Sequence, residues 1–348
     1  MVSNIISFNA LYLAATFFTS FTIGIIAIPR FTSFLKNISF SQTVSFYINN
    51  IGDHCKKSKT PPMGGIVILS SSFFAFFLFY HNYISSVIVL ITCTGLCFGL
   101  LGFIDDYKKI TSKQHFGLLI KIRLLAEIII AVTIVAITNY LHGNNPEYAN
   151  TLIIGNYKIN SFIFYSFVRV FAIVGSANGI NITDGLDGLA AFPSFLCFVF
   201  FAFFSFIISV NPNGFVSYQS VYDANMITPF CIALCGGILS FLWFNVKPAK
   251  IFMGDTGSLS LGGMLGAIAV IIKAEFLLVI LGSVFVIETI SCILQIASFK
   301  LFGKRIFLIA PIHHHFEKKG LAEITIVARA WVFSIISFIV ALVVFAIS

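Results

Sequence analysis

The chain has 348 residues, of which 58% are hydrophobic and only 10% are charged. Its mean hydropathy of +1.00 reflects more apolar surface than a soluble domain can bury, so the composition excludes a soluble globular protein and indicates a polytopic membrane protein. The formal net charge of +8 favours anionic headgroups and phosphorylated substrates as partners, and no nucleic-acid partner is expected.

The apolar segments predict about ten membrane-spanning helices that form a single domain over residues 1–348. They lie at residues 11–29, 63–80, 84–104, 122–141, 160–177, 188–210, 226–246, 258–272, 276–299 and 324–347. The fifth and eighth segments are short for a full crossing, and we expect them to be tilted, shielded by neighbours or broken at glycines. The predicted fold class is an all-α polytopic membrane protein.

The basic residues between these segments fall almost entirely on one face. One set of loops carries Arg30, Lys36, Lys56, Lys57, Lys59, Lys108, Lys109, Lys113, Lys247, Lys250, Lys300, Lys304, Arg305, Lys318 and Lys319. The other set carries only Lys158 and Lys273. The positive-inside rule places the first set in the cytoplasm, and ten spans then leave both termini outside.

The first basic-face loop ends Lys56-Lys57-Ser58-Lys59-Thr60-Pro61-Pro62-Met63-Gly64-Gly65. Its lysines either steer a phosphate group or only fix the membrane topology. The third span then closes with Asp105 and Asp106. Adjacent carboxylates repel each other unless a cation or a proton relieves them. The pair indicates a Mg²⁺ site shared with substrate phosphates or, more simply, a solvated helix end.

Two further carboxylate motifs lie on the same face. Residues 178–189 read Asn-Gly-Ile-Asn-Ile-Thr-Asp-Gly-Leu-Asp-Gly-Leu, and the glycines let backbone approach a ligand closely. The motif lacks the spacing and the closing Glu of an EF-hand, which argues against a calcium loop. Residues 245–258 place Asp255 between two glycines just before the eighth span. Asp255 is expected to bind a ligand, to cap that helix, or to do both.

The most unusual segment is Pro311-Ile312-His313-His314-His315-Phe316-Glu317, which is predicted as a polar loop between two apolar segments. Imidazoles donate hydrogen bonds, carry charge near neutral pH or bind metal. The cluster therefore indicates a site for a polar, anionic ligand, with a solvated His-rich loop as the alternative.

All of these motifs fall on one face of the membrane. Clustered Asp, Lys and His side chains suit metal-assisted phosphoryl transfer, in which the protein mainly positions groups and neutralises charge. The membrane location suggests that one substrate is a lipid phosphate.

With these motifs, the chain resembles the phospho-N-acetylmuramoyl-pentapeptide transferases of the polyprenyl-phosphate N-acetylhexosamine-1-phosphate transferase superfamily. The resemblance runs through essentially the whole chain. It rests on residues 105–109, 181–189, 241–245, 252–255, 294–295 with 298–300, and 310–317. The Asp motifs mark the superfamily, whereas Pro-Ile-His-His-His-Phe-Glu is specific to the muramoyl-pentapeptide branch.

The resemblance implies a Mg²⁺-dependent enzyme of the bacterial inner membrane. Such an enzyme transfers phospho-MurNAc-pentapeptide from UDP-MurNAc-pentapeptide to undecaprenyl phosphate, giving lipid I and UMP in peptidoglycan synthesis. The implied catalytic residues are Asp105 as the favoured base, Asp106, Asp184, Asp187, Asp255 as the Mg²⁺ ligand, and His314. The implied substrate-binding residues are Lys57, Lys109, Lys121, Asn181, Asn245, the uracil-stacking Phe252, Gln295, His313 and His315. A homodimer is left open, as is the choice between direct attack and a covalent Asp intermediate.

The chain departs from the family pattern in two places. The family usually reads Gly-Thr-Pro-Thr-Met-Gly-Gly before the second span, whereas this chain has Lys59 and Pro62 in place of the first Gly and the second Thr. The change puts in question a hydroxyl contact at position 62 and the flexibility of the loop. Leu321 follows Gly320 where the family usually has Trp, which should affect packing more than chemistry.

Three other functions compete with this interpretation. A sibling enzyme that uses UDP-GlcNAc is the nearest, and the uninterrupted histidine run argues against it. A secondary transporter would place its carboxylates near the membrane midplane, often at internal repeats, whereas here they cluster at one surface and no repeat is visible. A purely structural membrane protein leaves the clustered Asp residues unexplained.

Overall fold

The computed structural model describes residues 10–37, 60–111, 117–141, 151–154, 157–210 and 218–347. This part of the chain contains twelve α-helices, one 3₁₀ helix and one β-hairpin. In chain order they are α1 (Ala10–Asn37), α2 (Gly65–Tyr80), η2 (His81–Tyr83), α3 (Ser86–Thr111), α4 (Ile120–Leu141), β1 (Thr151–Ile154), β2 (Tyr157–Asn160), α6 (Phe162–Thr183), α7 (Ala191–Val210), α8 (Tyr218–Asn245), α9 (Gly254–Ile271), α10 (Glu275–Leu281), α11 (Ser283–Phe302), α12 (Ile312–Lys318) and α13 (Glu323–Ile347).

The polytopic, predominantly helical architecture is confirmed. Nine helices of the described residues are long and apolar enough to cross a membrane, and α4, which covers the predicted fourth span, is a further helix of 22 residues. The predicted all-α class holds for the described residues, which add one short antiparallel hairpin in which β1 pairs with β2 and Thr151 lies opposite Asn160.

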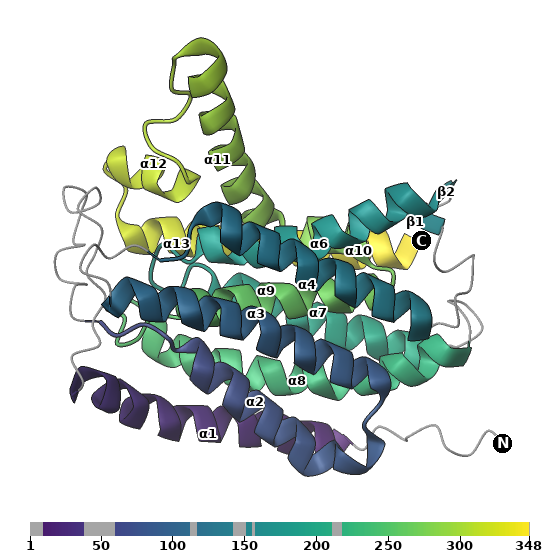
Figure 1. Ribbon diagram of the computed structural model, residues 1–348. Helices are drawn as coiled ribbons and strands as arrows, with labels where there is room; N and C mark the ends of the chain where they lie inside the picture. Colours follow the sequence, from purple (N-terminus) through teal and green to yellow (C-terminus); the bar gives the residue numbers. More distant parts are fainter. Residues whose placement is uncertain are drawn as a thin grey trace.

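The predicted ninth span is not one helix. It breaks at Gly282, which ends α10 and precedes α11. Glycine is a poor helix former because ordering its backbone costs the most entropy. Figure 1 shows the consequence: most helices lie side by side in one bundle, whereas α11 leaves the bundle and α12 lies beside it.

Helix α9 forms the centre of the bundle, and all of its residues are buried. Small residues let its neighbours approach closely. A Cβ built on Gly65 of α2 would lie 2.2 Å from the Cα of Gly257, and one on Gly102 of α3 would lie 2.2 Å from the carbonyl oxygen of Asp255. The first turn of α9 is therefore held directly against α2 and α3.

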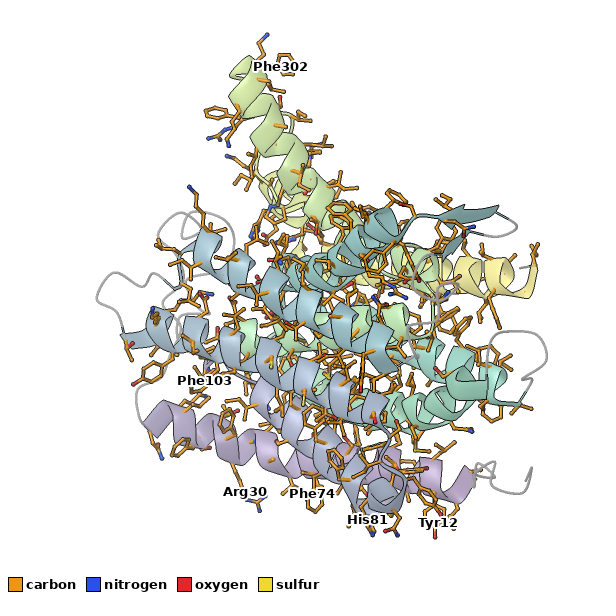
Figure 2. The ribbon with its side chains drawn as sticks, turned by 45° about the vertical axis from the view of Figure 1, so that its right-hand side comes forward. Tyr12, Arg30, Phe74, His81, Phe103 and Phe302 are labelled. Carbon is orange, nitrogen blue, oxygen red and sulfur yellow. The ribbon has the colours of Figure 1, made fainter. Side chains whose placement is uncertain are left out.

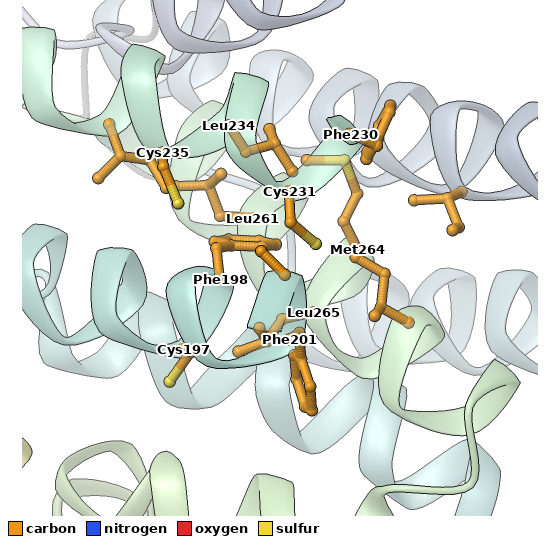
Figure 3. Close-up of a cluster of buried hydrophobic side chains, with 14 of the residues drawn as sticks. Cys197, Phe198, Phe201, Phe230, Cys231, Leu234, Cys235, Leu261, Met264 and Leu265 are labelled. Carbon is orange, nitrogen blue, oxygen red and sulfur yellow. The ribbon is translucent and has the colours of Figure 1, made fainter. Parts of the chain in front are cut away.

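Aromatic and sulfur-containing side chains fill the core between α7, α8 and α9. Figure 3 shows Phe198 and Phe201 of α7, Cys231 of α8, and Leu261 and Met264 of α9 packed together. By contrast, large apolar side chains such as Phe74 and Phe302 are 57% and 72% exposed on the outside of the molecule (Figure 2). An apolar exterior around an apolar core is what a lipid environment permits.

The first turns of α1 and the last turns of α13 lie at the same end of the bundle. Gly236 of α8 abuts the backbone of Phe17, and Gly24 abuts Ser240, so α1 runs in the same direction as α8. At the other chain end, Phe345 of α13 packs against Phe204. The opposite end of the bundle, where α3 and α8 end and α9 begins, carries the polar motifs.

Candidate functional site

The N-terminus of α9 is the structural centre of the candidate site. Gly254 has φ +73°, a conformation that L side chains rarely adopt. The backbone N–H groups of Asp255 and Thr256 each donate to Asp106, both at 3.0 Å, and the Thr256 hydroxyl donates to it at 2.7 Å. The Asp184 carboxylate lies near the backbone of Gly254. These N–H groups lack partners within their own helix and favour negative charge.

Two structural alternatives are therefore wrong. Asp106 of α3, rather than Asp255, caps α9. The Asp105–Asp106 pair is not a solvated helix end either, because the two residues are only 2% and 1% exposed. Gly102 lies one turn before the pair and packs against the backbone of Asp255, so the close approach of α3 to α9 buries both carboxylates.

Asp255 is held between two basic side chains. Lys109 Nζ lies 3.0 Å from its Oδ1, and Arg123 Nη1 lies 2.9 Å from its Oδ2. Lys109 Nζ also lies 2.6 Å from Asp105 Oδ2, and the backbone N–H of Leu118 donates to Asp105 Oδ1 at 2.5 Å. Lys109 thus bridges Asp105 and Asp255 and supplies a cation that relieves the repulsion expected between the adjacent carboxylates.

Sequence reasoning missed Arg123 and Glu127 of α4. Arg123 Nε lies 3.5 Å from Glu127 Oε1, and Arg123 Nη2 donates to Asn178 Oδ1 at 3.5 Å. The side-chain amide of Asn178 in turn donates to Glu127. A signal was present, since charged residues four apart on an otherwise apolar membrane helix are rare and usually functional. The predicted Lys121 instead lies on the exposed side of α4.

Asp184 and Asn181 come close to the same helix end from α6. Asn181 donates its amide to the Ser258 hydroxyl at 2.9 Å. Burial, reinforced by the neighbouring Asp255 and Asp106 carboxylates, raises the pKa of Asp184 well above its usual range. The site therefore concentrates more carboxylates than its own cations neutralise.

Asp187 and Asn245 fasten the loops that surround the site. Asp187 Oδ2 accepts the N–H of Ala249 at 3.1 Å. Asn245 Oδ1 accepts the N–H of Gly188 at 2.9 Å, and its amide donates to the Ile251 carbonyl at 2.9 Å. The Asp187–Ala249 and Asn245–Gly188 bonds therefore join the motif at the end of α6 to the motif at the end of α8.

The segment before α2 docks on Phe252. The N–H of Phe252 donates to the Pro61 carbonyl at 2.9 Å, and Gly64 donates to the Phe252 carbonyl at 2.8 Å. Pro62 is buried between these contacts and fits there because neither of these bonds uses the nitrogen of residue 62. Phe252 itself is half-buried. Lys57, predicted to contact phosphate, lies outside the described residues.

The histidine segment is helix α12 rather than a solvated loop, and His313 and His314 are buried. His313 Nδ1 lies 3.0 Å from Glu288 Oε2 of α11, and its Nε2 is buried with no hydrogen-bond partner among the described residues. A Cβ on Gly185 would lie 2.4 Å from that nitrogen, so the ring faces the loop that follows Asp184.

The other two histidines have different partners. His314 Nδ1 lies 2.6 Å from Glu317 Oε2, whereas His315 Nδ1 accepts the N–H of Leu308 at 3.1 Å. Gln295 accepts the N–H groups of Ile306 and Phe307 at 3.1 and 2.9 Å. His315 and Gln295 therefore fix the connection between α11 and α12.

Comparison with known proteins decides the family. The model of glycosyl transferase family 4 matches residues 87–273. A phospho-N-acetylmuramoyl-pentapeptide-transferase from Wolbachia sp. subsp. Drosophila simulans is 42% identical over 92% of this chain and 95% of its own length. Proteins of the same name from Buchnera aphidicola and Bacillus pumilus are 39% and 38% identical, over 98% and 91% of this chain and 95% and 92% of their own lengths. The chain belongs to the phospho-N-acetylmuramoyl-pentapeptide-transferase family.

The donor set of this family member suits a hard cation. Within the described residues, no group of three or more His, Cys, Asp or Glu side chains is arranged to hold a metal ion by itself. Mg²⁺ usually takes one or two carboxylates and completes its shell with waters and substrate phosphates. Asp255 and Asp184 offer such oxygen donors at the N-terminus of α9, so the residues fit a cation that is shared with a substrate.

Proposed function

We propose that this transferase moves phospho-MurNAc-pentapeptide from UDP-MurNAc-pentapeptide to undecaprenyl phosphate, giving lipid I and UMP in peptidoglycan synthesis. Family membership supports the reaction type. The observation that carries the site is the triad of Lys109, Asp255 and Arg123 at the N-terminus of α9. Paired cations beside a helix N-terminus are suited to bind a diphosphate.

The proposed arrangement in the membrane is ten spans, with both termini outside and the α9 N-terminus at the cytoplasmic surface of the bacterial inner membrane. Three features support it: the apolar exterior, the shared end of α1 and α13, and the basic residues at the opposite end. A site at that surface receives a nucleotide substrate from the cytoplasm and a lipid phosphate from the bilayer.

The protein has an apolar cavity that suits the chain of the acceptor lipid. A cavity of about 320 Å³ lies between α6, α10 and α11 and is lined mostly by apolar side chains, including Phe171, Phe285 and Ile293. Its α6 wall ends at Ser176, two residues before Asn178 of the polar network. A polyprenyl chain in this cavity would bring its phosphate toward Asp105 and Lys109.

Each residue of the site has a separate role in the proposed reaction. Asp105 would take the proton of the lipid phosphate when that phosphate is protonated. Lys109 and Arg123 neutralise the negative charge that develops on the diphosphate, while His313 and His314 bind the donor on the side of α12. Asp255 would hold Mg²⁺, which would supply further charge neutralisation. Phe252 stacks on the uracil.

The test is an assay of the purified protein with Mg²⁺, undecaprenyl phosphate and either UDP-MurNAc-pentapeptide or UDP-GlcNAc, scored by UMP release. We expect UMP only with the muramoyl donor. Asp255→Asn should lose more than 99% of the turnover, about 3 kcal/mol of transition-state stabilisation, and remain folded.

A matched control is Asp223→Asn, because Asp223 lies near the beginning of α8, roughly 30 Å along that helix from Asn245. This variant should retain wild-type turnover. UMP release with UDP-GlcNAc alone would assign the chain to the sibling reaction, and substantial turnover by a folded Asp255→Asn protein would remove Asp255 from the mechanism.

A further inference from the structure

A second cavity lies beside the histidine helix α12. It encloses about 310 Å³ between α11, α12 and α13. Its walls are apolar side chains, including Ile287, Phe316, Leu321 and Phe333, apart from Glu288, His313 and Arg329. The cavity shares His313 and Glu288 with the proposed site but is built by a different set of helices from the cavity between α6 and α11.

Arg329 is the feature of this cavity that packing does not explain. It is exposed and is the only charged residue of α13 after Glu323, in a helix whose mean hydropathy is the highest of the nine candidate spans. It lies about 9 Å along the helix from Glu323, and an arginine at that depth in a membrane is costly unless it is paired or reaches the headgroup layer.

Within the described residues Arg329 has no ion pair or hydrogen bond. The one carboxylate that lines the cavity is Glu288, and His313 Nδ1 already engages it at 3.0 Å. The counter-ion of Arg329 must therefore come from outside this part of the chain. Because the side chain is exposed on a helix that faces lipid, an anionic group of the bilayer is the nearest source.

We propose that this cavity is a binding site for an anionic phospholipid, with the phosphate paired to Arg329 and an acyl chain against the apolar walls. A guanidinium binds phosphate through parallel N–H donors. A free anion would gain nothing from Ile287, Phe316 and Phe333, whereas an acyl chain buries apolar surface on them. Basic residues at a membrane surface also attract anionic lipid headgroups.

The shared wall couples this site to the proposed active site. His313 and Glu288 line the cavity, so a bound acyl chain packs against the pair that orients the His313 ring. Lipid that binds only the folded state also stabilises it by mass action. Phosphatidylglycerol should therefore raise the melting temperature of the protein, a readout that does not depend on turnover or on the proposed reaction.

The experiment uses the full chain, purified in a neutral detergent and stripped of lipid. Melting temperature and native mass spectra are recorded with phosphatidylglycerol, phosphatidylcholine or undecaprenyl phosphate. Wild type should retain phosphatidylglycerol at least fivefold more than phosphatidylcholine and melt several degrees higher with it. Arg329→Gln should lose this preference, whereas Arg305→Gln, at an exposed position in the connection after α11, should keep it.

A second variant tests the apolar half of the site. Leu321→Trp places a larger ring in the cavity and should reduce phosphatidylglycerol retention while Arg329 stays in place. An unchanged lipid preference in Arg329→Gln would overturn the proposal, as would retention that Leu321→Trp does not alter. Displacement of phosphatidylglycerol by equimolar undecaprenyl phosphate would also overturn it, since the cavity would then belong to the acceptor lipid.

Discussion

Asp184 shows how a single residue of the site can oppose stability. Because burial and the neighbouring carboxylates raise its pKa well above the usual range, the folded protein holds this proton at pH values where the unfolded chain has lost it. Folding then becomes less favourable as pH rises. This loss of stability is absent below about pH 4, the pKa of an Asp side chain in the unfolded chain. It is complete above the raised pKa of Asp184 in the folded protein.

Asp184→Asn should therefore stabilise the protein at alkaline pH. Asparagine keeps a side-chain oxygen near the Gly254 backbone but cannot ionise. We expect its melting temperature to exceed that of wild type at alkaline pH, and the difference to vanish as pH falls toward about 4. Thermal unfolding of both proteins in the same detergent measures this. A variant that melts below wild type at alkaline pH would show that ionised Asp184 stabilises the fold.

Arg123 supports a second prediction at the residue scale. It pairs with Asp255 at 2.9 Å and with Glu127 at 3.5 Å, and Glu127 is fully buried. Arg123→Ala should destabilise the protein by about 1–3 kcal/mol, because buried charged groups lose their partner. Adding Glu127→Gln should restore part of that stability without restoring turnover.

A double-mutant cycle separates these effects. Chemical denaturation gives the free energy of unfolding for the wild type, both single variants and the double variant. Equal losses from Arg123→Ala in the presence and absence of the Glu127 charge would show that the two residues are uncoupled. Recovery of UMP release in the double variant would show that Arg123 acts only on stability.

Contacts between distant residues explain why the site was only partly predictable. The Asp105–Asp106 pair, Asp255 and the Asn178–Leu189 motif stand out in the sequence because polar residues are rare beside apolar segments. The sequence does not show which aspartate caps α9, because Asp106 and the N–H of Asp255 that it accepts are 149 positions apart. Arg123 was missed in favour of Lys121 because the sequence does not tell which face of α4 meets α9.

At the scale of elements, the glycine contacts of α9 set the geometry of the site. Gly102→Ala would place a Cβ 2.2 Å from the carbonyl oxygen of Asp255, in a position where only backbone movement makes room. We expect a loss of about 1–3 kcal/mol of stability from overpacking, together with loss of turnover, because α3 would carry Asp105 and Asp106 away from α9.

Gly175→Ala is the matched control, since its Cβ would meet only the Phe171 ring at 3.9 Å. That variant should unfold like wild type. Melting temperatures of the two variants make the comparison, whereas UMP release is compared only between Gly102→Ala and wild type, because Gly175 lines the cavity proposed for the acceptor lipid. Wild-type turnover in Gly102→Ala would mean that the positions of Asp105 and Asp106 tolerate a shift of α3.

Elements were predictable to the extent that hydropathy defines them. The long apolar segments located α7 and α13 within a few residues because both helices are apolar over their whole length. Helix α8 begins at Tyr218, well before the predicted start at residue 226. The break at Gly282 was not predicted, since apolar residues flank it on both sides. Helix α12 was taken for a loop because five of its seven residues are polar, and its form depends on contacts with Glu288 and Leu308 of other segments.

At the scale of the whole molecule, polar networks occupy both ends of the bundle. Opposite the candidate site, Arg169 is fully buried 4.2 Å from the Tyr165 ring centre, and Tyr165 donates to Glu275 at 2.8 Å. The sequence has charged residues near both ends of the bundle, but it predicts loops rich in Lys and Arg only at the end that carries the candidate site. That asymmetry separates the two networks: one is buried inside the protein, and the other faces the loops that carry most of the positive charge.

The proposed membrane orientation rests on the same asymmetry and can be tested directly. Two single cysteines are placed in a background from which the native cysteines have been replaced. Lys318→Cys reports on the exposed end of α12, and Ile159→Cys reports on the 42% exposed Ile159 of β2. The positive-inside rule puts position 318 in the cytoplasm and position 159 outside.

In intact spheroplasts, a membrane-impermeant maleimide should label Ile159→Cys at once but should label Lys318→Cys only after permeabilisation. Both variants should release UMP at the wild-type rate, so that labelling reports on a folded protein. Immediate labelling of Lys318→Cys in sealed spheroplasts would reverse the orientation and separate the N-terminus of α9 from any cytoplasmic nucleotide substrate.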